Sequence, residues 1–289
     1  MENRHGYLKP IVTQHFTYIK DSQHLIQILN NKKLKAFDKL HTGDFESLYT
    51  NITIETAIQN VMELFKLTNN ENISCFAFYT FLKLVLLNNY FYYKNKSVYR
   101  FFLQIKGVSI GTSCGPSIAN LHLAFYEIKY KSLLNSILYF RFIDDVFFVS
   151  KYLINDAFFQ DIYPHLKLNI MSSNVVNFLD LNISIDFDYS LIFNLYIKPT
   201  NTQNYFDMES NNVKFIFDNI PRSLIHRIRR ICTNLNDYYY HSTKLHKILK
   251  DKGYQSSQVK HLIRVYANMN RVDLIPYKLK QDNYIGIEQ

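Results

Sequence analysis

The chain has only three cysteines, no tryptophan and no long apolar run. Cys75, Cys114 and Cys232 lie far apart and form no CxxC or Cys/His ligand pattern, which argues against a disulfide framework or a zinc site and indicates a reducing compartment. No segment reaches the ~18 apolar residues of a membrane helix, and the start, MENRHGYLKP, is not a signal peptide. The sequence therefore predicts an intracellular protein with no membrane partner.

Repeats, low-complexity linkers and the common phosphate-binding fingerprints are also missing. The chain contains neither a P-loop nor a GxGxxG motif, so neither of those nucleotide-binding classes is indicated. Its 289 residues are 47% apolar and 20% charged, which is typical of a globular protein. That length suits one large domain or two subdomains that share a cleft.

Positive charge is concentrated at the C-terminal end. Residues 221–289 hold 13 Lys or Arg against 5 Asp or Glu, a net +8 out of +9 for the whole chain. Such an uneven distribution indicates a polyanionic partner, with nucleic acid ahead of an anionic membrane. A solvated basic face that serves only solubility would give the same count.

Two adjacent acids interrupt the most apolar stretch of the chain. Asp144 and Asp145 lie within YFRFIDDVFFVS, residues 139–150, which reads as a pair of strands buried on at least one face. Carboxylates near a core are costly unless a cation or several donors compensate them, and oxygen ligands favour a hard ion such as Mg²⁺. A water-facing Asp-Asp turn is the equally simple alternative.

A third acid, Asp44, lies in HTGDFESLYTNI, residues 41–52. The segment begins like a short strand, and residues 53–67 then predict a helix capped by Thr53 or Asn51. A carboxylate at a strand end before a helix is a common ligand position in α/β sites, although a turn aspartate would look the same.

A glycine-rich loop leads into another helical pattern. Gly107, Gly111, Gly115 and Pro116 precede a helix that runs to about Glu127. Glycines allow close approach of the backbone to a ligand, and the helix start favours anions. On its own this is a weak phosphate signal.

The C-terminal helices present their cations at helical spacing. A helix that starts near Pro221 places Arg222, His226, Arg229 and Arg230 on one side and its apolar residues on the other, and a later helix over residues 257–269 carries Lys260 and Arg264. This arrangement suits contact with a phosphate backbone without base reading. The other expected elements are helices over 22–31, 76–93 (in the core) and 155–168, a strand over 98–107, and two strands over 177–200 around a turn at 188–190.

Three of these stretches, in this order, resemble the palm motifs of reverse transcriptases. DFESLY is similar to the first motif, GTSCGPSIAN to the second, and FIDD to the aromatic-x-Asp-Asp box. NFLDLNI, YIKPT, IPRSLIHRIRRIC, KGY and LIPYK resemble downstream blocks of the Penelope-like retroelement group, a relative of telomerase reverse transcriptase. The resemblance extends from Asp44 to Lys280 and implies an RNA-directed DNA polymerase of nuclear location.

The resemblance also implies the reacting groups. Asp44, Asp144 and Asp145, with the Phe45 carbonyl, would hold two Mg²⁺ ions (Mn²⁺ as a substitute), and the ions would activate the primer 3′-hydroxyl and stabilise the leaving pyrophosphate. Tyr49 matches the steric gate that excludes a ribose 2′-hydroxyl, so dNTPs would be preferred.

Other roles follow from the same resemblance. Gly111 and the helix after it would line the nascent base pair, Phe142 would bind substrate, and Phe178 and Leu179 would belong to a primer-grip hairpin. Lys9, in LKPIV, would meet a triphosphate, although a plain surface lysine is the simpler interpretation. The partners would be an RNA template, a DNA primer or RNA/DNA duplex, and dNTPs.

The expected fold is an α/β (α+β) right-hand polymerase palm with reduced fingers and a helical thumb. The domains would be a residual fingers segment (1–40), a palm with a fingers-like insertion (41–210) and a basic thumb (211–289). Ile110 stands where many reverse transcriptases have Gln, and no GIY-YIG endonuclease follows. The short fingers leave open a catalytically weak remnant that binds nucleic acid, and an RNA-copying RNA polymerase is disfavoured by Tyr49.

Overall fold

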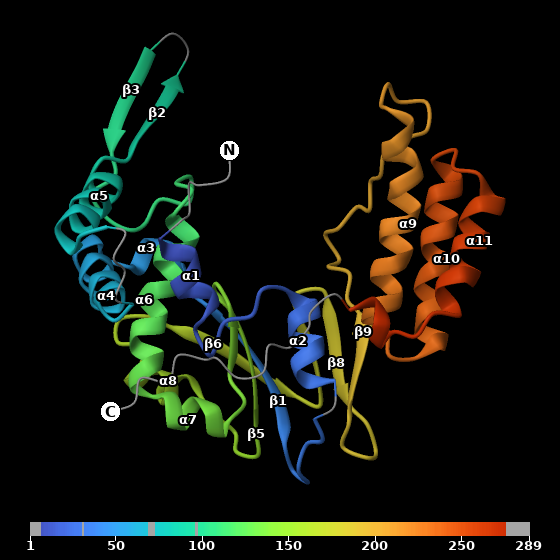
Figure 1. Cartoon of the computed structure of the whole chain (residues 1–289), viewed down its shortest axis with the longest axis horizontal. Coiled ribbons are helices and arrows are strands. Elements are labelled where there is room, and N and C mark those ends of the chain that lie inside the picture. Colours follow the sequence, from blue (N-terminus) through green and yellow to red (C-terminus); the bar gives the residue numbers. More distant parts are fainter. Residues whose placement is uncertain (1–6, 31, 69–72, 96–97, 276–289) are drawn as a thin grey trace. The chain divides into compact units, whose positions relative to one another are not determined.

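Two compact units make up the chain in the computed structural model, which describes residues 7–30, 32–68, 73–95 and 98–275 (Figure 1). The described part of the first unit comprises residues 7–19, 41–68, 73–95 and 98–172, and that of the second comprises 20–30, 32–40 and 173–275. Residues 20–40 and 173–210 belong to the same unit as the helical tail, and the predicted domain boundaries stay predictions. The fingers, palm and thumb labels remain predictions.

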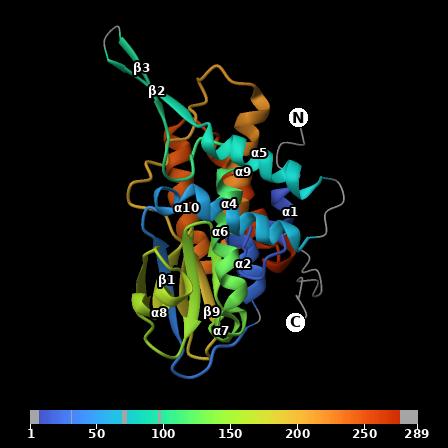
Figure 2. The same cartoon turned by 90° about the vertical axis from the view of Figure 1, so that its left-hand side faces the viewer.

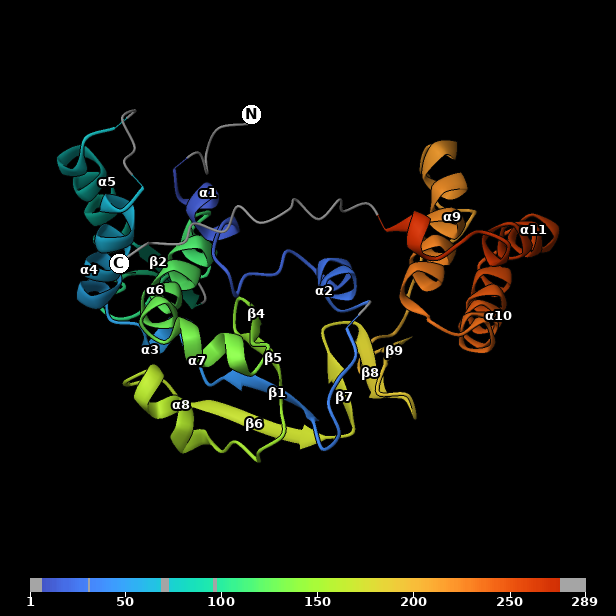
Figure 3. The ribbon, with the colours of Figure 1, turned by 60° about the horizontal axis from the view of Figure 1, so that its bottom comes forward.

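The first unit is built on a four-stranded sheet of order β4-β5-β1-β6. Between β1 and β4, and again between β5 and β6, the chain passes through helices, which gives a β-α-β-β-α-β arrangement of the ferredoxin-like kind. β1 and β6 run side by side in Figure 3. The strands are β1 (Lys39–Phe45), β4 (Phe140–Phe142), β5 (Asp145–Ser150) and β6 (Leu168–Ser173).

Helices of the first unit bury their apolar faces in one core with the sheet. Thr53 caps α4 as expected by accepting a hydrogen bond from Thr56 N at 3.2 Å, and Val146 and Phe148 of β5 belong to the same core as α4 and α6. Figure 2 shows α4, α5 and α6 close to one another. The helices are α1 (Leu8–Thr13), α3 (Leu48–Asn51), α4 (Ile54–Lys66), α5 (Cys75–Leu87), α6 (Gly115–Lys129), α7 (Lys131–Ser136) and α8 (Asp156–Ile162).

Two predicted helices of this unit are shorter than the sequence indicates. The core helix expected over 76–93 ends at Leu87 and buries only Phe78, Leu82 and Leu86, and the chain then forms a hairpin of β2 (Tyr90–Asn95) and β3 (Val98–Leu103). The helix expected over 155–168 ends at Ile162, because Pro164 disfavours the helical conformation of the residue before it. Apolar composition alone does not distinguish helix from strand in such short runs.

The second unit combines a three-stranded sheet with a helical tail. Its strands β7 (Val175–Phe178), β8 (Leu181–Ile185) and β9 (Leu191–Leu195) are antiparallel, and the hairpin predicted around 188–190 is confirmed by the β8–β9 pairing. The helices are α2 (Ser22–Leu29), α9 (Lys214–Ile231), α10 (Leu235–Asp251), α11 (Ser256–Ala267) and the 3₁₀ turn η1 (Val272–Leu274).

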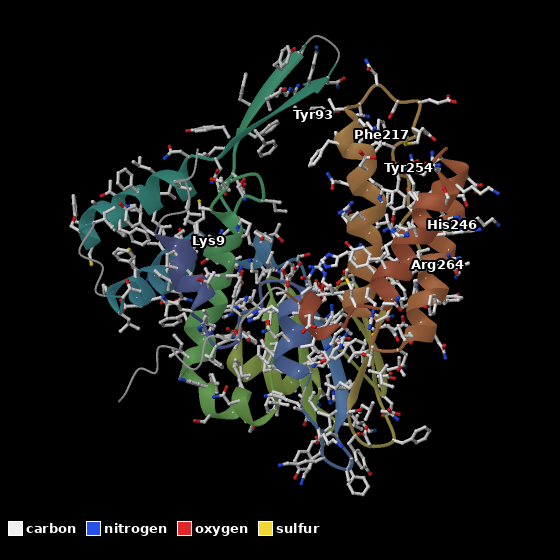
Figure 4. All side chains as sticks on the ribbon, turned by 45° about the vertical axis from the view of Figure 1, so that its right-hand side comes forward. Lys9, Tyr93, Phe217, His246, Tyr254 and Arg264 are labelled. Atoms are coloured by element: carbon white, nitrogen blue, oxygen red, sulfur yellow. The ribbon has the colours of Figure 1, made fainter. Side chains whose placement is uncertain are left out.

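α9 starts before the residue that was expected to open it. Pro221 lies inside the helix, where its missing N–H costs one backbone bond. Phe217 lies one helical turn before Pro221. Its ring packs edge to face against that of Tyr254, with 6.4 Å between the ring centroids, and this contact stabilises the start of α9 (Figure 4). α10 was not recognised as a separate helix, while α2 and α11 lie close to their predicted ranges. Of the downstream block LIPYK, residues 276–278 lie outside the described part.

Candidate active site and nucleic-acid interface

Asp44 and Asp144 stand at neighbouring strand ends of the first unit. β1 carries Asp44 next to its last residue, Phe45, whose backbone N donates to the Asp144 carbonyl at 3.1 Å. The Phe45 ring is buried against Tyr163, with ring centroids 4.9 Å apart, which anchors that end of the strand. Two motifs about a hundred residues apart in sequence are therefore brought to one place.

The acids are less buried than the sequence indicates. Asp44 is exposed, and Asp144 and Asp145 are half-buried. Within the described ranges, no three His, Cys, Asp or Glu side chains are arranged as a metal cluster. Half-burial of Asp144 and Asp145 does not by itself require a cation, and the metal site stays a prediction based on oxygen donors of the kind that hard divalent ions prefer.

The turn that presents Asp144 is strained. Phe142 pairs with Asp145, so the hairpin closes through Ile143 and Asp144, and Ile143 has a φ of 56°. This left-handed conformation is unfavourable for a β-branched residue and costs about 1–3 kcal/mol. Contacts from the surrounding structure must therefore stabilise this conformation of Ile143.

A buried ion pair supplies that support. Arg141 donates through Nη1 to the Ile143 carbonyl at 3.1 Å, and its Nε and Nη2 bind the carboxylate of Glu127 at 2.5 and 3.0 Å. Both side chains are essentially inaccessible. Asn120 Oδ1 accepts from Arg141 Nη1 at 2.6 Å, and three more groups bind the Glu127 carboxylate: His15 Nε2 (2.7 Å), Thr17 Oγ1 (2.6 Å) and Tyr163 Oη (2.9 Å).

The ion pair determines the charge state of Glu127. Burial by itself raises the pKa of a carboxyl group, but Arg141 and the bond to His15 outweigh it and hold the pKa of Glu127 well below its usual range. Sequence analysis missed this network. The available signal was a charged residue between apolar neighbours, Arg141 between Phe140 and Phe142 and Glu127 between Tyr126 and Ile128.

Tyr49 lies beside the acidic turn. Its pKa is raised by partial burial and then by the negative charge of Asp144. The Tyr49 carbonyl accepts from Val108 N at 2.7 Å, and the adjacent Gly107 has a φ of +83°. A Cβ on Gly107 would lie 2.8 Å from the Tyr49 carbonyl oxygen, so only glycine lets the loop close on α3 here.

The other predicted substrate residues of this unit are accessible. Gly111 and Lys9 are exposed, Phe142 is half-buried, and Lys9 lies on α1 (Figure 4). A Cβ added to Gly111 would meet nothing closer than Ser109 Oγ at 3.8 Å, so the fold itself does not require glycine there. Lys167, an exposed lysine of this unit, is paired with Glu46 at 2.9 Å.

The predicted primer-grip residues occupy the β7–β8 turn of the second unit. The Phe178 side chain is only 3% exposed and its ring belongs to the core, so its role in a primer grip stays a prediction. Leu179 is half-buried with a φ of 54°. Asp180, next in the turn, accepts from Arg227 of α9 at 2.6 Å, which fixes the turn to that helix.

Most of the predicted cations lie on the surface of α9 and α11, but Arg229 does not. Arg229 is buried, donates to the Met269 carbonyl at 3.1 Å and lies over the Tyr238 ring, so its placement on the exposed helix face was wrong. The helical spacing of α9 could not predict that α10 packs against this side of the helix. Arg222, Lys260 and Arg264 are exposed, whereas His226 and Arg230 are half-buried.

Two features of the helical tail were not foreseen. The pKa of His226 is lowered, first by burial against its surroundings and then by the charge of Arg230, so the neutral form is favoured. α10 also adds exposed cations: Lys244, Lys247 and Lys250.

No helix of the described residues is long and apolar enough to cross a membrane.

A family model described as "Animal helix-turn-helix domain" matches residues 204–264, which cover α9, α10 and most of α11. It covers well under half of the chain. No curated protein matches.

The fold is similar to solved telomerases. The Candida albicans telomerase in complex with a TWJ fragment of telomeric RNA matches with a TM-score of 0.62 at 10% identity, over 93% of this chain and 54% of that one. Apo telomerase from Candida tropicalis truncated from its C-terminal domain matches with a TM-score of 0.51 at 16% identity, over 65% and 44%. This chain thus spans about half the length of the structures it matches. At such identities the likeness shows a telomerase-like fold and no more.

Proposed function

We propose that the protein is an RNA-directed DNA polymerase that transfers dNTPs to a primer 3′-hydroxyl. The observation that carries this proposal is the hydrogen bond from Phe45 N to the Asp144 carbonyl, which brings the ends of two separately recognised acidic motifs together. The telomerase-like fold supports the same interpretation. Membership of the Penelope-like group, and with it a nuclear location, rests on the sequence motifs.

Asp44, Asp144 and Asp145 would hold the Mg²⁺ ions, together with the Phe45 carbonyl. Their carboxylate oxygens, exposed or half-buried at adjoining strand ends, are donors of the kind that hard divalent ions prefer. When bound, the ions would supply charge neutralisation for the attacking and leaving oxygens. Mn²⁺ would fit the same donors.

Tyr49 would select deoxynucleotides. The effect of the Asp144 charge on the pKa of Tyr49 supports this role, because Asp144 is a proposed metal ligand, and the Gly107 contact fixes the Tyr49 backbone. Replacing the ring by alanine should raise incorporation of UTP relative to dTTP by about 10-fold or more, the discrimination that a cavity of that size allows. Tyr49→Phe keeps the ring and should keep the preference.

The helical tail would bind the RNA/DNA duplex through its phosphates. Exposed cations on α9, α10 and α11 provide contacts that read no bases. The match to a helix-turn-helix family over the same residues agrees with a nucleic-acid role.

Primer extension on poly(rA)/oligo(dT) with dTTP and Mg²⁺ tests the proposal. The native chain should extend the primer, and Asp144→Asn should lower the rate by about 10³-fold or more, because a ligating charge contributes several kcal/mol. Asp188→Asn, an exposed turn aspartate of the second unit, is the matched control and should extend normally. Extension by Asp144→Asn at the native rate would refute the proposed site.

A second candidate is a nucleic-acid-binding protein with weak or no catalysis. The specific observation in its favour is that the described carboxylates do not form a ready metal cluster. If the native chain binds the duplex in a salt-sensitive way and extends no primer, this candidate replaces the first.

A further inference from the structure

The hairpin β2–β3 is an aromatic ribbon exposed on both faces. Its register pairs Tyr90 with Leu103, Tyr92 with Phe101 and Lys94 with Tyr99, and these pairs alternate with those of the other face. Every residue of both strands is exposed, and the ribbon extends away from α5 in Figures 1 and 2. Seven of its twelve residues are aromatic: Tyr90, Phe91, Tyr92, Tyr93, Tyr99, Phe101 and Phe102.

Such a ribbon gains little from folding by itself. An isolated two-stranded hairpin is marginally stable in water, and a contiguous exposed apolar surface usually marks an interaction site. Tyr92 is 63% and Phe101 74% exposed, although core aromatic rings are usually almost fully buried. A partner that covers these rings is therefore indicated.

The charge of this region identifies the partner class. Residues 72–126 contain five Lys or Arg and no Asp or Glu. Lys83, Lys94, Arg100 and Lys106, four of those five, are exposed. The complement to a surface with this charge is an anionic one.

The rings cluster on both faces, tilted by 50° and 48° around Tyr92 on one face and stacked on the other. On one face Tyr92 lies 5.9 Å from Tyr99 and 6.2 Å from Phe101 between centroids, and Lys94 Nζ lies 5.1 Å above the Tyr99 ring. On the other face Phe91 and Phe102 stack at 5.3 Å and 18°. Flat rings flanked by cations match the stacked bases and phosphates of a single strand.

We propose that the ribbon β2–β3 binds single-stranded nucleic acid, with its rings stacked on bases and with Lys94 and Arg100 on phosphates. RNA and DNA share this chemistry. The cations beside the rings favour a polyanion with flat bases, and the test below distinguishes it from a lipid surface. The proposal does not depend on catalysis at Asp144, so Asp144→Asn should bind single strands as the native chain does.

Binding of labelled single-stranded oligonucleotides of about 12 nucleotides, RNA and DNA, tests the proposal by fluorescence anisotropy. Tyr92→Ala with Phe101→Ala should weaken binding by at least about 10-fold, because each stacked base contributes about 1–3 kcal/mol. The matched control is Tyr152→Ala with Phe187→Ala, two other highly exposed rings, and should bind normally. Circular dichroism verifies that both variants are folded.

An abasic oligonucleotide of the same length separates stacking from charge. The native chain should bind it at least about 10-fold more weakly than the normal strand, and the ring variant should not distinguish the two. Equal affinity of the native chain for both strands would overturn the proposal, as would a ring variant with native affinity. If the ring variant lost binding to anionic lipid vesicles but kept native affinity for oligonucleotides, the ribbon would be assigned to membranes instead.

Discussion

Arg141 connects the interior of the first unit to the acidic turn. It holds the strained Ile143 carbonyl at 3.1 Å while its charge is neutralised by Glu127. A buried ion pair adds little net stability over apolar residues, but breaking it leaves a charge in a poorly solvating interior. The geometry therefore indicates that the pair positions the Asp144 turn rather than adding stability as such.

Glu127→Gln should therefore destabilise the fold strongly. Loss of one partner of a buried pair costs about 3–5 kcal/mol, measured by urea unfolding. The control is Glu63→Gln, which removes an exposed pair with Lys66 and should cost at most about 1 kcal/mol. A Glu127→Gln change no larger than that of the control would contradict the role of the pair.

The same carboxyl group gives the stability a defined pH dependence. Its pKa is lower in the folded than in the unfolded chain, so the stabilisation is complete above the unfolded value of about 4.3 and declines as the pH falls below it. The stability difference between the native chain and Glu127→Gln should thus shrink in acid. A difference that grows there would contradict the assignment.

Gly107 and Gly111 differ in what they permit. Gly107→Ala combines positive φ with a clash against the Tyr49 carbonyl and should lower stability by about 1 kcal/mol or more. Gly111→Ala has open space around the new Cβ, so stability should stay within about 0.5 kcal/mol, while primer extension falls if the nascent base pair occupies that space. Thermal unfolding tests the effects of both changes on stability, and primer extension tests the role of Gly111. Full extension by Gly111→Ala would remove Gly111 from the proposed site.

At the scale of elements, the exposed and buried cations of the tail should behave differently. Lys260→Gln with Arg264→Gln should reduce the slope of log affinity against log salt for duplex by about 0.9 for each phosphate that is no longer neutralised. Arg229→Met should leave the slope unchanged and instead lower stability, because the Met269 carbonyl would have no donor from this side chain. Lys151→Gln, an exposed lysine of the first unit, is the control. A reduced slope for Arg229→Met would restore that residue to the interface.

The sequence predicted helices and strands best where the signal came from residues close together in the chain. The Thr53 cap and the amphipathic pattern after it gave α4 nearly to its ends, and the alternation around 188–190 gave the β8–β9 hairpin. The strand expected over 98–107 is confirmed in part by β3, which ends at Leu103, but β2 was missed because the apolar and aromatic run before it reads equally as a helix. Burial of Arg229 could not be predicted either, since it depends on α10 packing on that face of α9.

At the scale of the whole molecule, the fold class was predictable and the site only in part. Three ordered motifs pointed to a polymerase palm, and the chain is similar to telomerases in fold. The motifs also gave Asp44 and Asp144, which the structure brings to adjacent strand ends. They could not give the Glu127–Arg141 pair, because the residues of its network come from four separate segments and carry no spacing signal.

The most direct test of the central claim is whether Asp44 and Asp144 act as one site. Primer-extension rates should be measured for the native chain, Asp44→Asn, Asp144→Asn and the double variant. Each single change should lower the rate by about 10³-fold or more, and the double variant should be no slower than the slower single one, because groups that act as a unit are strongly non-additive. Native extension by Asp44→Asn, or rate reductions that multiply in the double variant, would contradict a shared nucleotidyl-transfer site.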